Sequence, residues 1–88
     1  MRWSPMPNEQ WAPRTVVKVS FERDPDTGEI DHLAPFRVTD RGGRHAGVYE
    51  DEPQVVVEME PETSVAYFEA QWIAGRWVFS HRVPDESW

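Results

Sequence analysis

The segment between residues 65 and 83 constrains the fold more than any other part of the chain. On 65–73 the small and apolar side chains occupy even positions, and on 76–83 they occupy odd positions. A hairpin centred on Ala74-Gly75 brings both sets onto one face, as a stable hairpin requires. The turn has two residues, or four from Ile73 to Arg76, in the same register. The expected cross-strand pairs are Trp72 with Trp77, Ala70 with Phe79, Phe68 with His81, and Ala66 with Val83.

The kind of apolar residue also favours a sheet. The chain contains eleven valines, two isoleucines and a single leucine, Leu33, and eleven aromatic residues supply the bulk. Leucine is typical of helical cores, whereas valine and aromatic residues suit a pleated, half-buried surface. A chain of 88 residues has room for one domain, and without cysteine it has no disulfide.

Three further strands are predicted upstream of the hairpin. Residues 15–22 alternate, with Val17, Val19 and Phe21 on one face, and a turn over 24–29 leads to a returning strand over 30–39. Phe36 and Val38 face inward on that strand, and Pro35 implies a bulge or a sheet edge. Residues 54–60 alternate again after a longer connection over 40–53. Residues 61–70 remain open between strand and helix, since Pro61 is able to start a helix.

The predicted fold is therefore all-β, a small antiparallel sheet or barrel of about five strands. The strands are expected over 15–22, 30–39, 54–60, 65–73 and 76–83. Residues 15–88 form the single β domain. Residues 1–14 carry three prolines that restrict sheet pairing, so we expect an irregular arm that Trp3 and Trp11 pin across the sheet.

The net charge of −7 is unevenly distributed. Residues 1–45 carry seven basic and seven acidic side chains, whereas residues 46–88 carry two basic and nine acidic ones. Contact with phosphates needs the opposite balance, so direct nucleic-acid binding is disfavoured and a protein partner with a basic surface is favoured. No stretch approaches the roughly 18 apolar residues of a membrane helix, and the start lacks the apolar core of a secretion signal. A cytoplasmic location is the default expectation.

The acidic residues near the middle of the chain form the sharpest candidate site. Glu58 and Glu60 fall on the outward face of the strand expected over 54–60, and the others flank it. Carboxylates spaced along a strand resemble a row of phosphates, the principle of small acidic DNA mimics, an analogy of charge and size only. The alternative is a solvated face that protects an edge strand. The candidate set is Glu50, Asp51, Glu52, Glu58, Glu60 and Glu62.

Two other candidate binding features lie outside that set. Trp88 either folds back on the thin core or docks in a partner, since tryptophan is enriched at binding hot spots. The loop with Arg41, Arg44 and His45 is the only basic cluster, and its glycines suit a phosphate or an acidic partner. It lacks the Lys-Ser/Thr of a phosphate-binding loop, which favours an ordinary solvated loop.

The residues that carry chemistry form no recognisable constellation. Asp24 and Asp26 have the spacing of a calcium loop, but the glycine comes one position early, and a plain hairpin turn, which explains the same residues, is favoured. His32, His45 and His81 are far apart in the sequence. We therefore expect no catalytic residues, no metal and no cofactor, and no enzymatic activity.

The sequence thus predicts a small acidic protein-binding module, an inhibitor or adaptor that acts on a basic protein surface. One alternative is an accessory subunit that exposed aromatic residues anchor in a larger assembly. Another is a small ligand-binding or enzymatic barrel that uses His45 or His81. The sequence carries no signal for an oligomeric state.

Overall fold

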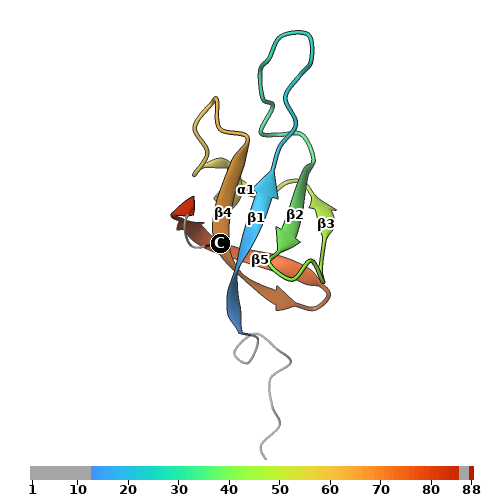
Figure 1. Cartoon of the computed structure of the whole chain (residues 1–88), viewed down its shortest axis with the longest axis vertical. Helices are drawn as coiled ribbons and strands as arrows, with labels where there is room; N and C mark the ends of the chain where they lie inside the picture. Colours follow the sequence, from blue (N-terminus) through green and yellow to red (C-terminus); the bar gives the residue numbers. More distant parts are fainter. Residues whose placement is uncertain (1–12, 86–87) are drawn as a thin grey trace, which may run out of the picture.

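The computed structural model describes residues 13–85 and 88, and within them a single antiparallel sheet curls into a half-barrel (Figure 1). The spatial order of the strands is β3-β2-β1-β4-β5. This arrangement confirms the predicted all-β class. The elements are β1 (Arg14–Ser20), β2 (Phe36–Asp40), β3 (Gly47–Tyr49), the short helix α1 (Pro53–Val56), β4 (Val65–Ile73) and β5 (Arg76–Val83).

The core fills the concave side of the sheet with the residues that the alternation selects. Val17 and Val19 of β1 and Phe68 of β4 are fully buried, and Phe79 of β5 meets the Phe68 ring edge-on at 6.1 Å between centroids. Phe21, Phe36 and Val38 are buried as predicted. One face of each strand therefore supplies the core, as period-two alternation requires.

The third strand was predicted in the wrong place. Residues 54–60 form no strand: they continue from α1 into a turn, and β3 lies instead within the expected 40–53 connection. Proline at the first helical position is compatible with a helix start, and the amides of Val55 and Val56 both donate to the oxygen of Glu52. Val55 is buried in the core and Met59 packs against it, whereas Val57 is exposed. Residues 65–70, left open between helix and strand, belong to β4.

The hairpin register is confirmed for its first half only. Trp72 pairs with Trp77 and Ala70 with Phe79, through a two-residue turn in which Ala74 (φ 54°) and Gly75 (φ 82°) both adopt positive φ. A bulge between Glu69 and Ala70 then shifts the register by one residue, so that Glu69 pairs with His81, Phe68 with Arg82 and Tyr67 with Val83. The expected inward position of His81 is therefore wrong, and His81 is exposed. Bulges bend and twist a strand, in keeping with the curl of this sheet.

The two edges of the sheet, β3 and β5, are bridged by side chains. The main-chain amide of Trp77 donates to the Tyr49 hydroxyl at 2.9 Å, and the Trp77 indole donates to the oxygen of His45 at 2.9 Å. The side-chain amide of Gln54 reaches the oxygen of Phe79 at 3.5 Å. These contacts occupy edge groups that would otherwise be available to another strand.

The arm expected over residues 1–14, with Trp3 and Trp11, lies outside the described residues except for Pro13 and Arg14. Arg14 already belongs to β1. In the described part of the chain, none of the helical segments has the length and apolar character needed to cross a bilayer.

Candidate functional site

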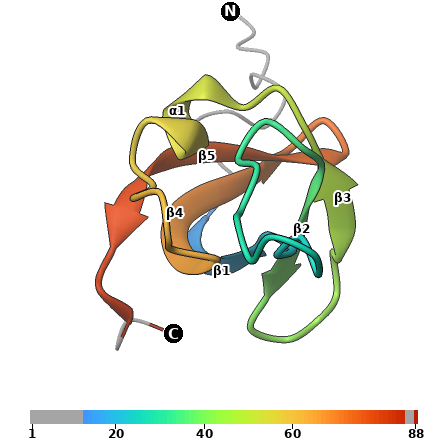
Figure 2. The ribbon, with the colours of Figure 1, turned by 90° about the horizontal axis from the view of Figure 1, so that it is seen from above.

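Two segments that are far apart in the sequence meet at one end of the half-barrel. The connection from β1 to β2 extends beyond the strand ends (Figure 1), and the segment between α1 and β4 contacts it at that end, which Figure 2 shows from above. The Arg23 guanidinium donates to the oxygen of Glu62 at 3.3 Å, and His32 Nε2 lies 2.8 Å from the oxygen of Thr63. The amide of Phe21 donates to the oxygen of Ser64 at 2.7 Å. These main-chain contacts hold the two segments together.

The meeting of these segments concentrates negative charge. Residues 22–31 carry five carboxylates and one guanidinium, a net charge of +1 − 5 = −4. Glu62 lines a hollow together with Glu29, and Asp51 lines another together with Leu33. We call this exposed group the acidic end. Its members are Glu22, Asp24, Asp26, Glu29, Asp31, Asp51 and Glu62.

In residues 13–85 and 88, no cationic side chain pairs with the acidic end. Among the described residues, no ion pair involves any of its seven carboxylates. Arg23, the nearest guanidinium along the chain, donates instead to the main-chain oxygens of Gly28 and Glu62. The negative charge of the acidic end is therefore not neutralised by the described residues, although the carboxylates of Asp24 and Asp31 accept main-chain amides.

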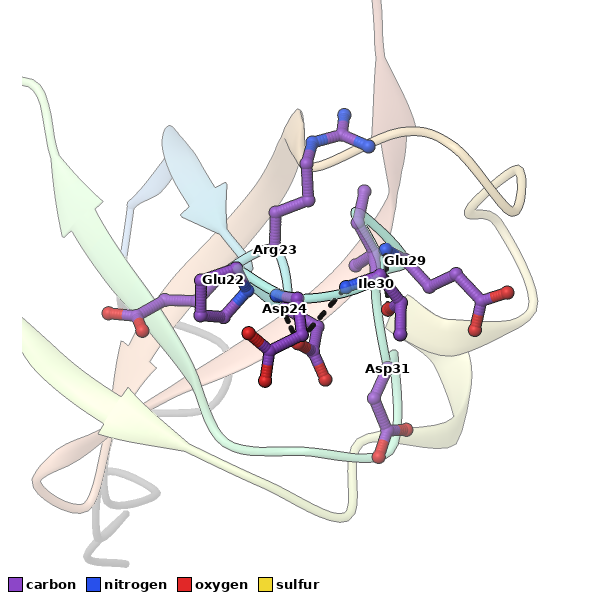
Figure 3. Close-up of a pocket in the computed structure, with 9 residues that line it drawn as sticks. Glu22, Arg23, Asp24, Glu29, Ile30 and Asp31 are labelled. Carbon is purple, nitrogen blue, oxygen red and sulfur yellow. Dashed lines mark hydrogen bonds between the residues drawn. The ribbon is translucent and has the colours of Figure 1, made fainter.

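The geometry of the β1–β2 connection is that of a turn and not of a metal loop. Asp24 Oδ1 accepts the amides of Asp26 at 2.8 Å and Thr27 at 3.4 Å, and Gly28 takes φ 77°. Figure 3 shows the side chains of Glu22, Glu29 and Asp31 pointing away from one another. In residues 13–85 and 88, no group of three or more acidic or histidine side chains is placed to hold a metal ion. The local hydrogen bonds account for Asp24 without a cation.

The predicted acidic set is divided by the fold. It forms no row on a strand, because Glu58 and Glu60 follow α1 in a non-helical segment. Glu52 is buried and forms an ion pair with Arg76. Glu50 lines a separate hollow of about 470 Å³ with Trp72 and Arg76. From the predicted set, only Asp51 and Glu62 join the acidic end.

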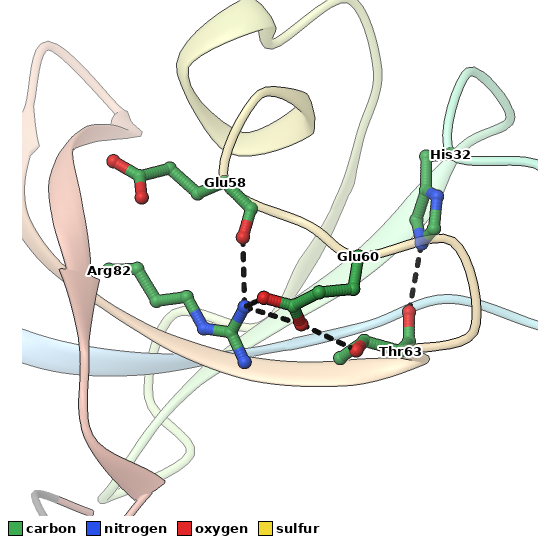
Figure 4. Close-up of polar contacts among 5 residues, drawn as sticks. All are labelled: His32, Glu58, Glu60, Thr63 and Arg82. Atoms are coloured by element: carbon green, nitrogen blue, oxygen red, sulfur yellow. Dashed lines mark hydrogen bonds and ion pairs between the residues drawn. The ribbon is translucent and has the colours of Figure 1, made fainter.

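Glu60 is held by a small polar network between the α1–β4 segment and β5 (Figure 4). Its carboxylate accepts the Thr63 hydroxyl at 2.7 Å and the Arg82 guanidinium at 3.0 Å. Arg82 also donates to the main-chain oxygen of Glu58 at 2.8 Å, while the Glu58 carboxylate points elsewhere. The Thr63 hydroxyl, and after it Arg82, hold the pKa of Glu60 below its usual value. Glu60 and Glu58 are both exposed, and the carboxylate of Glu60 is engaged by side chains of its own chain.

Thr63→Val is expected to raise the pKa of Glu60 toward that of an ordinary glutamate, because it removes the strongest of these hydrogen bonds. A carboxyl whose pKa is lowered by folding stabilises the fold above its unfolded pKa, and that contribution disappears as the pH falls through the folded pKa. The variant should therefore be less stable than the wild type at neutral pH but not in acid. NMR titration of the Glu60 carboxyl checks the pKa. Thr39→Val on β2 is the control, and an unmoved Glu60 titration in Thr63→Val would contradict the expectation.

An apolar hollow adjoins the acidic end. It has a volume of about 290 Å³ and lies between the β1–β2 connection and α1. Leu33 and Val57 line it and do not contribute to the core, since 79% of the surface of Leu33 and 78% of that of Val57 are exposed. Sequence reasoning missed this feature, and its one signal was a lone leucine among turn residues. We call it the apolar hollow, and it is lined by His32, Leu33, Asp51, Glu52, Pro53, Val56 and Val57.

The basic loop lies at the other end of β2 and does not join the acidic end. Asp40 Oδ1 accepts the amide of Arg44 at 2.7 Å and that of His45 at 3.3 Å, so these amides are already bonded. The His45 ring stacks on Trp72 at 4.0 Å between centroids. Arg41 and Arg44 are exposed. His45 is therefore a packing residue as well as a loop residue.

Trp88 packs on its own chain. Its ring lies 5.4 Å from that of Tyr67, and the residue is half-buried. His81 Nδ1 lies 3.9 Å from the Glu69 carboxylate on the exposed side of the hairpin. The structure therefore brings neither of these candidates to the acidic end.

Comparisons with known proteins identified no relative. No family model matches the chain, and neither the curated proteins nor the solved structures include a significant match. The function must therefore be inferred from the acidic end and the apolar hollow.

Proposed function

We propose that this protein is a binding module without chemistry of its own, and that its acidic end docks on a basic surface of a protein partner. The observation that carries the proposal is the gathering of seven exposed carboxylates at one end of the half-barrel, from the β1–β2 connection, the β3–α1 connection and the α1–β4 segment, with no ion pair to any of them among the described residues. A surface of one sign attracts a partner of the opposite sign and orients it during encounter.

Solubility alone does not require this arrangement. Like charges that are crowded together repel one another, and the same number of carboxylates spread over the surface would keep the chain soluble at a lower cost in stability. A basic partner would relieve the repulsion at the acidic end. The negative sign also argues against nucleic acid as the partner.

The placement of the histidines supports binding over catalysis. His32 bonds a main-chain oxygen beside the acidic end, His45 stacks on Trp72 at the far end of β2, and His81 lies on the exposed hairpin. Acid–base catalysis needs such groups to converge on one substrate position. Their separation favours a module that works through its surface.

The test compares the immobilised wild type with two immobilised double variants. Proteins that each retains from the source cell's lysate are identified by mass spectrometry. Glu29→Lys combined with Glu62→Lys reverses two charges at the acidic end. Glu50→Lys combined with Asp85→Lys makes the same change in net charge elsewhere. We expect a partner that the wild type and the second variant retain, that the first variant loses, and that high salt releases.

Retention that is equal for the two double variants would contradict the proposal, because net charge rather than the acidic end would then decide binding. Retention that persists at high salt would also contradict it. The side chains of Glu29 and Glu62 are exposed, so their replacement should leave the fold intact. Circular dichroism of each variant checks this.

A further inference from the structure

The apolar hollow is an exposed apolar surface that the fold itself does not use. Leu33 and Val57 are the two most exposed large apolar residues of the described chain, and both line the same hollow. Single exposed apolar side chains are common, but two that face one concave site are a feature of binding surfaces. The hollow is therefore a candidate docking site for a partner.

Both walls of the hollow are held in place before any partner arrives. On the loop side, the Asp31 carboxylate accepts the amide of Leu33 at 2.9 Å, and the His32 ring meets Phe21 edge-on at 4.9 Å between centroids. On the helix side, the amide of Val57 donates to the oxygen of Pro53 at 3.0 Å. A preformed site binds more tightly than one that must be ordered on binding.

The size of the hollow limits what it can accept. Pockets for small molecules usually enclose about 300–1,000 Å³, and this hollow of about 290 Å³ falls just below that range. It is also open and mostly apolar. A single large apolar side chain from a partner fits these dimensions better than a free ligand.

The carboxylates around the hollow indicate the charge of the partner residues on either side of that side chain. Asp51 lines the hollow, Asp31 precedes it by one residue, and Glu58 follows Val57 directly. The Glu52 carboxylate in the lining is already paired with Arg76. An apolar centre with a charged rim is the usual anatomy of a protein interface, and a rim of carboxylates complements Lys and Arg.

We infer that the apolar hollow receives one large apolar side chain of a protein segment that carries Lys or Arg on both sides of it. The inference rests on the proposed function and names the class of partner. The segment's basic residues pair with the acidic end and with Glu58. Its apolar residue covers Leu33 and Val57.

The test is selection of peptides from a random displayed library on the full chain, followed by affinity measurements on the enriched peptides. We expect a large apolar residue flanked by Lys or Arg. Val57→Ser and Leu33→Ser should each weaken binding about tenfold or more, equivalent to about 1.4 kcal/mol. Val48→Ser is the matched control, since Val48 is 67% exposed on β3, away from the hollow, and should change the affinity less than about twofold.

The other outcomes separate the inference from the proposed function. Basic peptides without an apolar residue, bound equally by Val57→Ser, would overturn the inference and leave the proposed function standing. Uncharged apolar peptides whose binding resists salt would overturn both. Enrichment of no peptide would contradict the inference. A wild-type dimer in sedimentation that Val57→Ser dissociates would also overturn it, because a second copy would then be the occupant.

Discussion

Trp77→Ala is expected to lower the free energy of unfolding by about 3–5 kcal/mol, the usual cost of truncating a buried tryptophan. Trp77 is 2% exposed and meets Trp72 edge-on at 5.2 Å between centroids. Alanine would leave a cavity there, and it would also leave the oxygen of His45 without the indole donor. Urea unfolding followed by circular dichroism measures the loss.

Two milder substitutions separate packing from hydrogen bonding at this position. Trp77→Phe keeps most of the buried ring but loses the indole N–H, and Tyr49→Phe removes the acceptor of the Trp77 amide. Each should cost about 1–3 kcal/mol, the range for leaving a buried polar group unpaired. A Trp77→Ala variant as stable as Tyr49→Phe would contradict the central role of this side chain.

Arg76→Met is expected to cost about 2 kcal/mol of stability, because it leaves the Glu52 carboxylate without its partner. The Glu52 side chain is only 10% exposed, whereas that of Arg76 is 51% exposed and lies over the Tyr49 ring at 5.0 Å. Water reaches the arginine side of the pair. The loss of stability should therefore be smaller than that caused by breaking a fully buried ion pair.

A double-mutant cycle tests the origin of that loss. Glu52→Gln should restore much of the stability when it is added to Arg76→Met, since the uncompensated charge is then gone. Arg14→Met provides the control, because the Arg14–Glu69 pair is largely exposed (59% and 29%) and should contribute less than about 1 kcal/mol. Losses of equal size at the two arginines would show that the burial of Glu52 does not matter.

Four of the five strands could be predicted because each buries one face, although the strand expected over 30–39 begins only at Phe36. Alternation on β1 and on the β4–β5 hairpin requires only that residues two apart point the same way. The third strand could not be located in this way, since β3 has only three residues, Gly47–Tyr49, and is too short to show alternation. The alternation read over 54–60 includes three consecutive valines, Val55, Val56 and Val57, a short apolar run that suits a helical turn as well as a strand. The bulge at Glu69 was also invisible in the sequence, because the alternation continues through it.

Only the negative charge of the candidate site could be predicted from the sequence, and its position could not. Counting charge by halves of the chain treated residues 1–45 as neutral, although five of their carboxylates lie within residues 22–31, and one of these, Glu29, shares a hollow with Glu62 in the folded protein. Glu52 looked available because its partner, Arg76, lies 24 residues away. Contacts between distant segments decide both cases, and local patterns do not report them.

The side-chain contacts between β3 and β5 have a consequence for the width of the half-barrel. In a closed β-barrel, the number of strands and the shear set the radius. Here the side chains of Tyr49 and Trp77 span the gap in place of a backbone ladder, and Gln54 of α1 joins the helix to β5. The distance between these two sheet edges is therefore bridged by side chains, and we expect it to depend on their length and rotamers and not on a shear fixed by strand pairing.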